Sequence, residues 1–381
     1  MQTKLKKYLE EQNLDGLLLV GDSICDPDMY YLTSFSAVDR FTILAAEKVT
    51  LLVSSMELGR AKHESSADEV VSTTEYGIRE LLKASGKPGE AYTAALIEFL
   101  RDHGAHRIGV PQRFPAGIYT TLSREFEVSI VESPVSKWRE VKSEQEIQAI
   151  RVVQKACEKA MRLAIDSISR SEPKGDYLYA DGKPLTSEKV RSSIEISLLE
   201  DGCDAIDTIV AGGTAAANPH ACGGGPLPAN SPVVIDIFPR SKSSRYFADM
   251  TRTVVRGEAS PEIVDIYDAV AAAQNAGIES VRAGVDGKEV HTIVSQVFKD
   301  RGYPEGENSG FIHSTGHGVG LEVHERPSLS EAGEVLQAGN VVTVEPGLYY
   351  PDLGGVRLED LVVVRKEGCD NLTEFERRLV V

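Results

Sequence analysis

Four acidic residues and one histidine stand out as groups that could bind metal ions. They are Asp236, Asp249, His317, Glu345 and Glu359. Each acid has apolar and β-branched neighbours, so we expect all four to lie on buried strands, where an unpaired carboxylate is strongly destabilising. Two divalent cations would cancel the four negative charges, whereas one ion would leave two of them uncompensated. The set therefore predicts an oxygen-rich, two-metal centre.

Further histidines surround this set. Residues 310–325 contain three of the eight histidines in the chain, His313, His317 and His324, with glycines between them. The spacing of four between the first two would place both on one face of a helix, but the glycines make a helix unfavourable. We therefore expect loop-borne histidines. His220 is a weaker candidate when it is considered alone, because a single loop histidine is more often structural.

Two residues could support the ligands. Thr251 and Arg357 are each two positions from a candidate ligand, Asp249 and Glu359 respectively. Side chains two apart on a strand share a face, so Thr251 and Arg357 are predicted to orient these ligands.

The overall charge restricts the class of partner. The chain has 41 Lys and Arg against 58 Asp and Glu, a formal charge of -17. Such an excess of acid opposes binding to nucleic acid. The start of the chain is a charged amphipathic segment and no apolar run approaches the ~18 residues of a membrane span, so we expect neither export nor a membrane partner. Five scattered cysteines without a CxxC pair favour the reducing cytoplasm.

The chain is long enough for two domains. Residues 1–134 alternate short apolar runs with helical stretches, as an α/β domain does. A loop near residues 134–142 leads to Ser143-Glu-Gln-Glu146, which predicts a capping box at the start of a helix. We therefore predict one domain over residues 1–134 and a second over residues 135–381.

The second half contains one arrangement twice. Two helices followed by two acidic strands are predicted over residues 143–249 and again over residues 260–359, with helices near 187–200 and 290–299 among them. A topological duplication of this kind would place the two acid pairs on facing halves of one curved sheet. Residues 169–185 are polar and rich in Gly, Pro and Ser, and they are predicted to form an exposed excursion.

Taken in order, the metal-binding set resembles that of the pita-bread metallopeptidases, the family of methionine aminopeptidase, aminopeptidase P and prolidase. The second half matches the pattern GHGxG, HExP, EPG and RxED through His317, His324, Glu345 and Arg357, and the first half resembles the creatinase/prolidase domain, including Tyr30-Tyr-Leu-Thr-Ser-Phe. The resemblance implies an α/β protein. A creatinase/prolidase-type amino-terminal domain would precede a pita-bread catalytic domain of α+β type with pseudo-twofold symmetry.

The same resemblance implies an activity. His313 matches a histidine of the proline-specific members, which favours hydrolysis of Xaa-Pro bonds in small peptides with proline at the second position. A prolidase is preferred to an aminopeptidase P. Glu345 looks like the general base, Arg357 would support the ligands, and His220, His313 and His324 would bind substrate, stabilise the oxyanion or assist the leaving nitrogen. The family implies two divalent ions, Mn2+ or Co2+ before Zn2+, and a homodimer.

Two other interpretations compete with this one. A metal-free amidinohydrolase like creatinase uses the same fold without the ligand set, and a non-catalytic binding protein of the family would have lost that set.

The chain also departs from the usual pattern of the family. Asp236-Ile-Phe-Pro stands where Asp-x-Gly is common, Asp249 follows thirteen residues after Asp236, and Ser314 replaces a common glycine. We therefore expect a longer hairpin between the two aspartates and an altered pocket lining.

Overall fold

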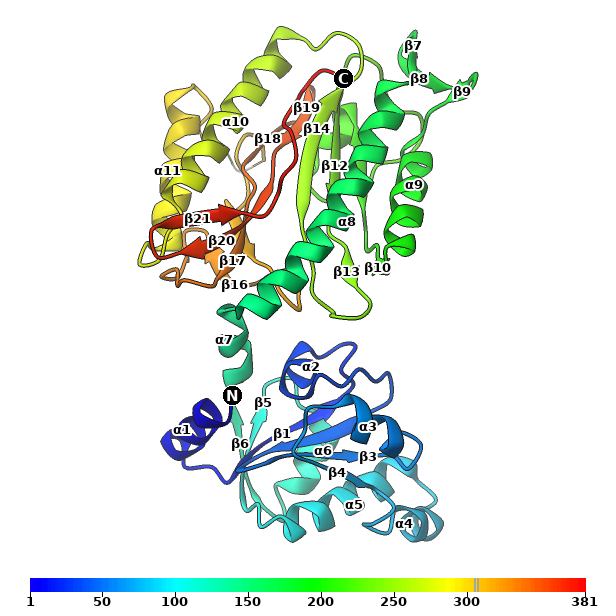
Figure 1. Ribbon diagram of the computed structural model, residues 1–381, viewed down its shortest axis with the longest axis vertical. Coiled ribbons are helices and arrows are strands. Elements are labelled where there is room, and N and C mark those ends of the chain that lie inside the picture. Colours follow the sequence, from blue (N-terminus) through cyan, green and yellow to red (C-terminus); the bar gives the residue numbers. More distant parts are fainter. Residues whose placement is uncertain (305, 307) are drawn as a thin grey trace. The chain divides into compact units, whose positions relative to one another are not determined.

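The chain forms two compact units (Figure 1). The computed structural model describes residues 1–304, 306 and 308–381, and it divides into Met1–Arg139 and Glu140–Val381. The division falls at the last residue of the short helix α7 (Pro134–Glu140). The domain boundary placed between residues 134 and 135 by the sequence stays a prediction.

A six-stranded mixed sheet forms the centre of the first unit. Its strand order is β4-β3-β2-β1-β5-β6, with β1 to β3 antiparallel and the other neighbours parallel. The strands are β1 (Gly16–Gly21), β2 (Phe41–Ala45), β3 (Val49–Val53), β4 (Glu69–Ser72), β5 (Arg107–Pro111) and β6 (Glu127–Val131). The helices are α1 (Gln2–Gln12), α2 (Pro27–Thr33), α3 (Leu58–Glu64), α4 (Ile78–Ser85), α5 (Pro88–Asp102) and α6 (Ala116–Leu122).

Both faces of that sheet are covered. Along β1, Leu17 and Leu19 belong to one buried apolar cluster, while Leu18 and Val20 belong to another. This alternation follows from the two-residue period of a strand. An α/β amino-terminal domain was predicted, and the structure confirms it.

Two helix pairs form one layer of the second unit. They are α8 (Glu144–Ser169) with α9 (Ser187–Glu200), and α10 (Pro261–Ser280) with α11 (Gly287–Asp300). Ser143 and Glu146 form the predicted capping box at α8, and the Ser260 side chain caps α10 by accepting from the Ile263 amide. Two helix pairs, each followed by acidic strands, agree with the predicted α+β arrangement.

Several small sheets make up the other layer. One has the order β11-β12-β14 and another the order β16-β15-β17-β20-β21, while β18 pairs with β19 and β10 with β13. The strands are β10 (Cys203–Asp204), β11 (Ile209–Gly212), β12 (Pro232–Ile237), β13 (Arg240–Ser241), β14 (Met250–Val255), β15 (Gly316–Gly318), β16 (Glu325–Leu329), β17 (Val341–Val344), β18 (Gly347–Tyr350), β19 (Gly354–Arg357), β20 (Asp360–Arg365) and β21 (Gly368–Asn371). The predicted single curved sheet is thus divided. The Glu359 amide links two parts of it by donating to the Thr251 carbonyl at 3.1 Å.

The polar excursion has regular structure of its own. Its strands β7 (Glu172–Lys174), β8 (Tyr177–Ala180) and β9 (Lys183–Pro184) form an antiparallel three-stranded sheet. The longer hairpin between the two aspartates contains β13, which pairs with β10. Among the helices of the described residues, none combines the length and the apolar character that a membrane crossing requires.

Candidate functional site

The four acids lie at or near the ends of strands in the second unit. Asp236 is within β12, whereas Asp249 directly precedes β14, Glu345 directly follows β17 and Glu359 lies between β19 and β20. The prediction that all four lie within strands is therefore wrong for three of them. In each case the strand begins or ends one residue away from the acid. Burial is as expected, since the side chains of these acids are at most 14% exposed.

His317 also differs from its prediction. It occupies the middle of the three-residue strand β15 and is not borne on a loop, because the flanking Gly316 and Gly318 fit closely against neighbouring backbone. A Cβ at Gly316 would lie 2.0 Å from the Thr343 carbonyl oxygen, so only glycine allows this pairing. His313 does lie on an irregular segment, as predicted.

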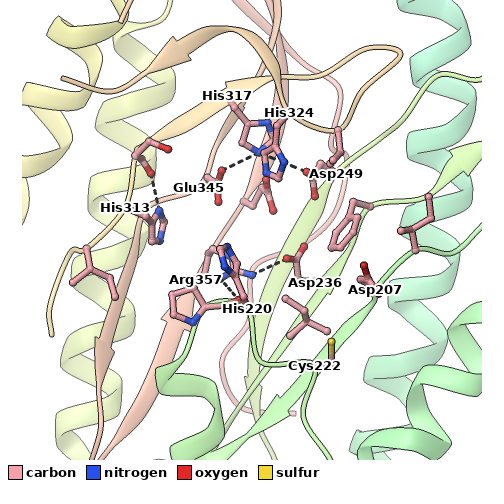
Figure 2. A pocket seen from close by; sticks show the side chains of 18 residues that line it. Asp207, His220, Cys222, Asp236, Asp249, His313, His317, His324, Glu345 and Arg357 are labelled. Carbon is pink, nitrogen blue, oxygen red and sulfur yellow. Dashed lines mark hydrogen bonds and ion pairs between the residues drawn. The ribbon is translucent and has the colours of Figure 1, made fainter. Parts of the chain in front are cut away.

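The five residues come together in space (Figure 2). His317 Nε2 is 3.1 Å from Glu345 Oε1 and 3.8 Å from Asp249 Oδ2. One ligating atom each from Asp249, His317 and Glu359 lie within 4.8 Å of one another. Asp236 adjoins this group and receives a hydrogen bond from Arg357 Nη2 at 2.7 Å. Residues more than 100 positions apart in the sequence thus form one acidic cluster.

Two details show that this cluster suits cations. His317 Nδ1 lies 3.2 Å from the Gly318 carbonyl oxygen, to which it must donate, so Nε2 faces two carboxylates. Burial lowers the pKa of His317, but the hydrogen bond and charge of Glu345 outweigh burial and raise it; a cation that displaces the Nε2 proton would meet the nitrogen lone pair there. Asp236 Oδ1 is buried and has no hydrogen-bond partner among the described residues. Both atoms would gain a partner from a divalent cation, and the oxygen-rich set with one imidazole fits such an ion.

Burial and mutual repulsion disturb the ionisation of the acids. Burial raises the pKa of Asp249 and Glu359 well above their ordinary values, with a further contribution from the neighbouring carboxylates, and burial also raises that of Asp236. For Glu345, burial acts in the same direction, but the hydrogen bond and charge of His317 outweigh it and lower the pKa. Positive charge at the cluster would keep all four acids ionised.

A buried hydrogen-bond network holds the acids in place. Thr251 Oγ1 donates to Glu359 Oε2 at 2.7 Å and accepts from Arg357 Nε at 3.0 Å. Arg357 also donates to Asp236, as described above, and to the Tyr349 hydroxyl at 2.9 Å. Thr251 and Arg357 were predicted to share strand faces with Asp249 and Glu359, yet their hydrogen bonds to acids go to Glu359 and Asp236 respectively, which are distant in the sequence.

Tyr349 has a role that the sequence did not indicate. Its hydroxyl lies 2.9 Å from His313 Nε2, and His313 Nδ1 lies 2.7 Å from the Ser314 carbonyl. Since that carbonyl must accept from Nδ1, the phenol donates to Nε2 and accepts from Arg357. No local pattern in the sequence singles out this tyrosine, because its partners His313 and Arg357 are 36 and 8 positions away.

A cavity of about 790 Å3 opens onto the cluster. Its walls include the three remaining candidate histidines, His220, His313 and His324. Burial lowers the pKa of His313 and His324, so both favour the neutral form, while His220 is exposed. The His324 ring centre is 4.2 Å from that of His317. The cavity has the size of a small-molecule site and holds neutral imidazoles beside a metal-suited cluster.

Comparisons with known proteins agree with this geometry. Residues 148–366 match metallopeptidase family M24, and residues 2–167 match the creatinase/prolidase N-terminal domain. An Xaa-Pro dipeptidase of Pyrococcus horikoshii is 31% identical over 394 residues, covering 100% of this chain and 99% of the relative. The crystal structure of the prolidase from Pyrococcus horikoshii has a TM-score of 0.82 at 29% identity, with 99% of each chain covered. That of an X-Pro aminopeptidase from Thermotoga maritima has a TM-score of 0.80 at 26% identity, covering 100% of this chain and 99% of the other.

Proposed function

Because this chain belongs to metallopeptidase family M24, we propose that it is a metal-dependent exopeptidase that hydrolyses Xaa-Pro dipeptides. The convergence of four carboxylates and His317 below a cavity lined by neutral histidines is the observation that carries this proposal. Full-length similarity to proteins named Xaa-Pro dipeptidase supports the dipeptide substrate.

Asp236, Asp249, His317, Glu345 and Glu359 would hold two divalent ions, Mn2+ or Co2+ in preference to Zn2+. Four buried carboxylates against the one guanidinium of Arg357 leave three negative charges, more than a single divalent ion would compensate, which supports two ions. When bound, the ions would polarise the scissile carbonyl and make an attacking water more acidic.

The protein side chains would perform the proton transfers and the positioning. Glu345 is the proposed general base, since its carboxylate faces the cavity and its lowered pKa keeps it unprotonated near neutral pH. His220, His313 and His324 would bind the substrate, stabilise the developing oxyanion or assist the leaving nitrogen. Arg357 would keep Asp236 ionised and correctly oriented through its 2.7 Å hydrogen bond.

The test is hydrolysis by the chelated and remetallated protein. We expect Ala-Pro to be cleaved after Mn2+ addition, Ala-Ala to resist cleavage, and the chelated protein to be inactive. Faster cleavage of Ala-Pro-Gly than of Ala-Pro would assign an aminopeptidase P. The similarity to the X-Pro aminopeptidase structure from Thermotoga maritima is the reason for testing this alternative. Cleavage of none of these peptides, together with no bound metal at micromolar Mn2+, would reject the proposal in favour of a binding protein.

We also propose that the protein is a cytoplasmic homodimer. The five free cysteines among the described residues support a reducing compartment, and the dimer is an expectation from the family resemblance. Sedimentation equilibrium of the metal-loaded protein would measure the assembly.

A further inference from the structure

Asp207 is a carboxylate of the cavity wall that the proposed metal centre does not use. It lies on the connection between β10 and β11 and is exposed. Within the part of the chain that the structure describes, it has no hydrogen bond or ion pair to another side chain. Every other carboxylate of the described cavity lining belongs to the acidic cluster. Asp207 is therefore a negative charge available to a ligand.

The two basic residues at β13, the strand that pairs with β10, are already paired with another acid. Arg240 Nη2 lies 3.3 Å and Lys242 Nζ 3.5 Å from carboxylate oxygens of Asp204, three residues before Asp207. Among the described residues that line the cavity, Arg357 is the sole arginine or lysine, and it donates to Asp236. Nothing positive on the cavity wall neutralises Asp207, so its field acts on what enters the cavity.

Apolar side chains line the same cavity. Ile206 directly precedes Asp207, and Ile209, Phe238 and Val323 also contribute to the wall. A ligand side chain that pairs an apolar stem with a cationic end suits this combination, because the stem can lie on apolar surface while the charge stays at the carboxylate. Lysine and arginine are the amino acids with that form.

The position of Asp207 indicates which part of a substrate it would meet. In the view of Figure 2, Asp207 lies on the side of Asp236 that faces away from His313. If the proline ring is held near His313 and the scissile bond lies at the acidic cluster, the residue before proline extends toward Asp207. This step rests on the proposed function.

We propose that Asp207 is a specificity-determining residue that selects Xaa-Pro dipeptides with lysine or arginine before the proline. The backbone provides a clean test. Asp207 has a φ of 47°, a left-handed conformation that asparagine adopts as readily as aspartate. Asp207→Asn therefore removes the charge while it preserves the shape and the turn. Asp181→Asn is the matched control, since Asp181 is an exposed aspartate with a φ of 51° on the β8–β9 turn, away from the cavity lining.

The experiment compares kcat/KM for Lys-Pro and for Met-Pro, a neutral substrate with a side chain of similar length. We expect Asp207→Asn to lower the Lys-Pro to Met-Pro ratio about five-fold, the upper end for an exposed charge pair. Both dipeptides carry the same α-ammonium group, so the ratio isolates the effect of the side-chain charge. Asp181→Asn should leave the ratio at the wild-type value. Added salt should reduce the ratio in the wild type and much less in Asp207→Asn.

An unchanged ratio in Asp207→Asn, or an equal change in Asp181→Asn, would overturn the assignment. Calorimetric binding of the same two dipeptides to the metal-loaded proteins separates this failure from that of the proposed function. If the wild type cleaves no dipeptide, a loss of Lys-Pro affinity confined to Asp207→Asn still supports the role of Asp207. Equal Lys-Pro affinity in the wild type and in Asp207→Asn would refute it.

Discussion

Replacing Thr251 with valine should weaken metal binding through the loss of one hydroxyl group. The Thr251 side chain is fully buried, and its Oγ1 connects Glu359 to Arg357 by hydrogen bonds of 2.7 Å and 3.0 Å. Valine retains the β-branched shape, so strand packing should persist while Glu359 loses the group that orients it. We therefore expect the perturbation to act mainly on the ligand.

The size of the effect follows from the charge of both partners. A hydrogen bond to a charged group contributes about 1.5–3 kcal/mol, and Thr251→Val removes two of them from a buried site. Loss of a residue that orients a metal ligand typically lowers metal affinity by roughly 10- to 100-fold. That range corresponds to about 1.4–2.8 kcal/mol of binding free energy.

Thr253 provides the matched control on the same strand. It is equally buried, but its Oγ1 donates to the Arg357 carbonyl at 2.9 Å and accepts from the Arg357 amide at 3.0 Å. Thr253→Val thus removes the same chemical group and leaves the side-chain contacts of Glu359 intact. Its metal affinity should stay within about three-fold of the wild type, although its free energy of unfolding should fall.

The assay is Mn2+ titration by calorimetry of chelator-treated protein, with urea unfolding measured on the same samples. We expect a loss of affinity in Thr251→Val that exceeds the loss in Thr253→Val by at least about three-fold. Equal losses in the two variants would mean that general destabilisation explains the effect. Unchanged affinity in Thr251→Val would show that its hydroxyl does not orient Glu359.

Two further predictions concern other parts of the molecule. Tyr349→Phe removes the hydroxyl that joins His313 to Arg357, so kcat/KM for Ala-Pro should fall about ten-fold while metal content, measured by elemental analysis, stays unchanged. In the first unit, the Arg107 hydrogen bond lowers the pKa of Asp15 from 3.8 to about 2. The carboxylate therefore stabilises the fold above pH 4, and this contribution to stability is lost as the pH falls toward 2. Asp15→Asn should therefore be less stable than the wild type at pH 7, and urea unfolding should show the difference shrinking between pH 4 and pH 2; a difference that is constant over this range would contradict the mechanism.

Local patterns in the sequence were sufficient for the helices of the second unit. The capping box at Ser143, the proline after Ser260 and the apolar periodicity of the helices concern residues within a few positions of one another. Such contacts form inside one element, so they can be predicted without the fold. The polar excursion was harder, because its three short strands depend on pairing between neighbours more than on composition.

The sequence by itself determined which residues could hold metal, since four acids in apolar surroundings require positive charge. Their roles as ligands stay predictions, but the structure brings all of them together with His317. Only the tertiary structure decided that the acids lie at or near strand ends, that Thr251 donates a hydrogen bond to Glu359, and that Asp207 lines the cavity with no side-chain partner among the described residues. Thr251 and Glu359 are 108 positions apart in the sequence. Contacts of that kind depend on how strands and helices pack, and no local pattern of residues encodes a distance between two separate strands.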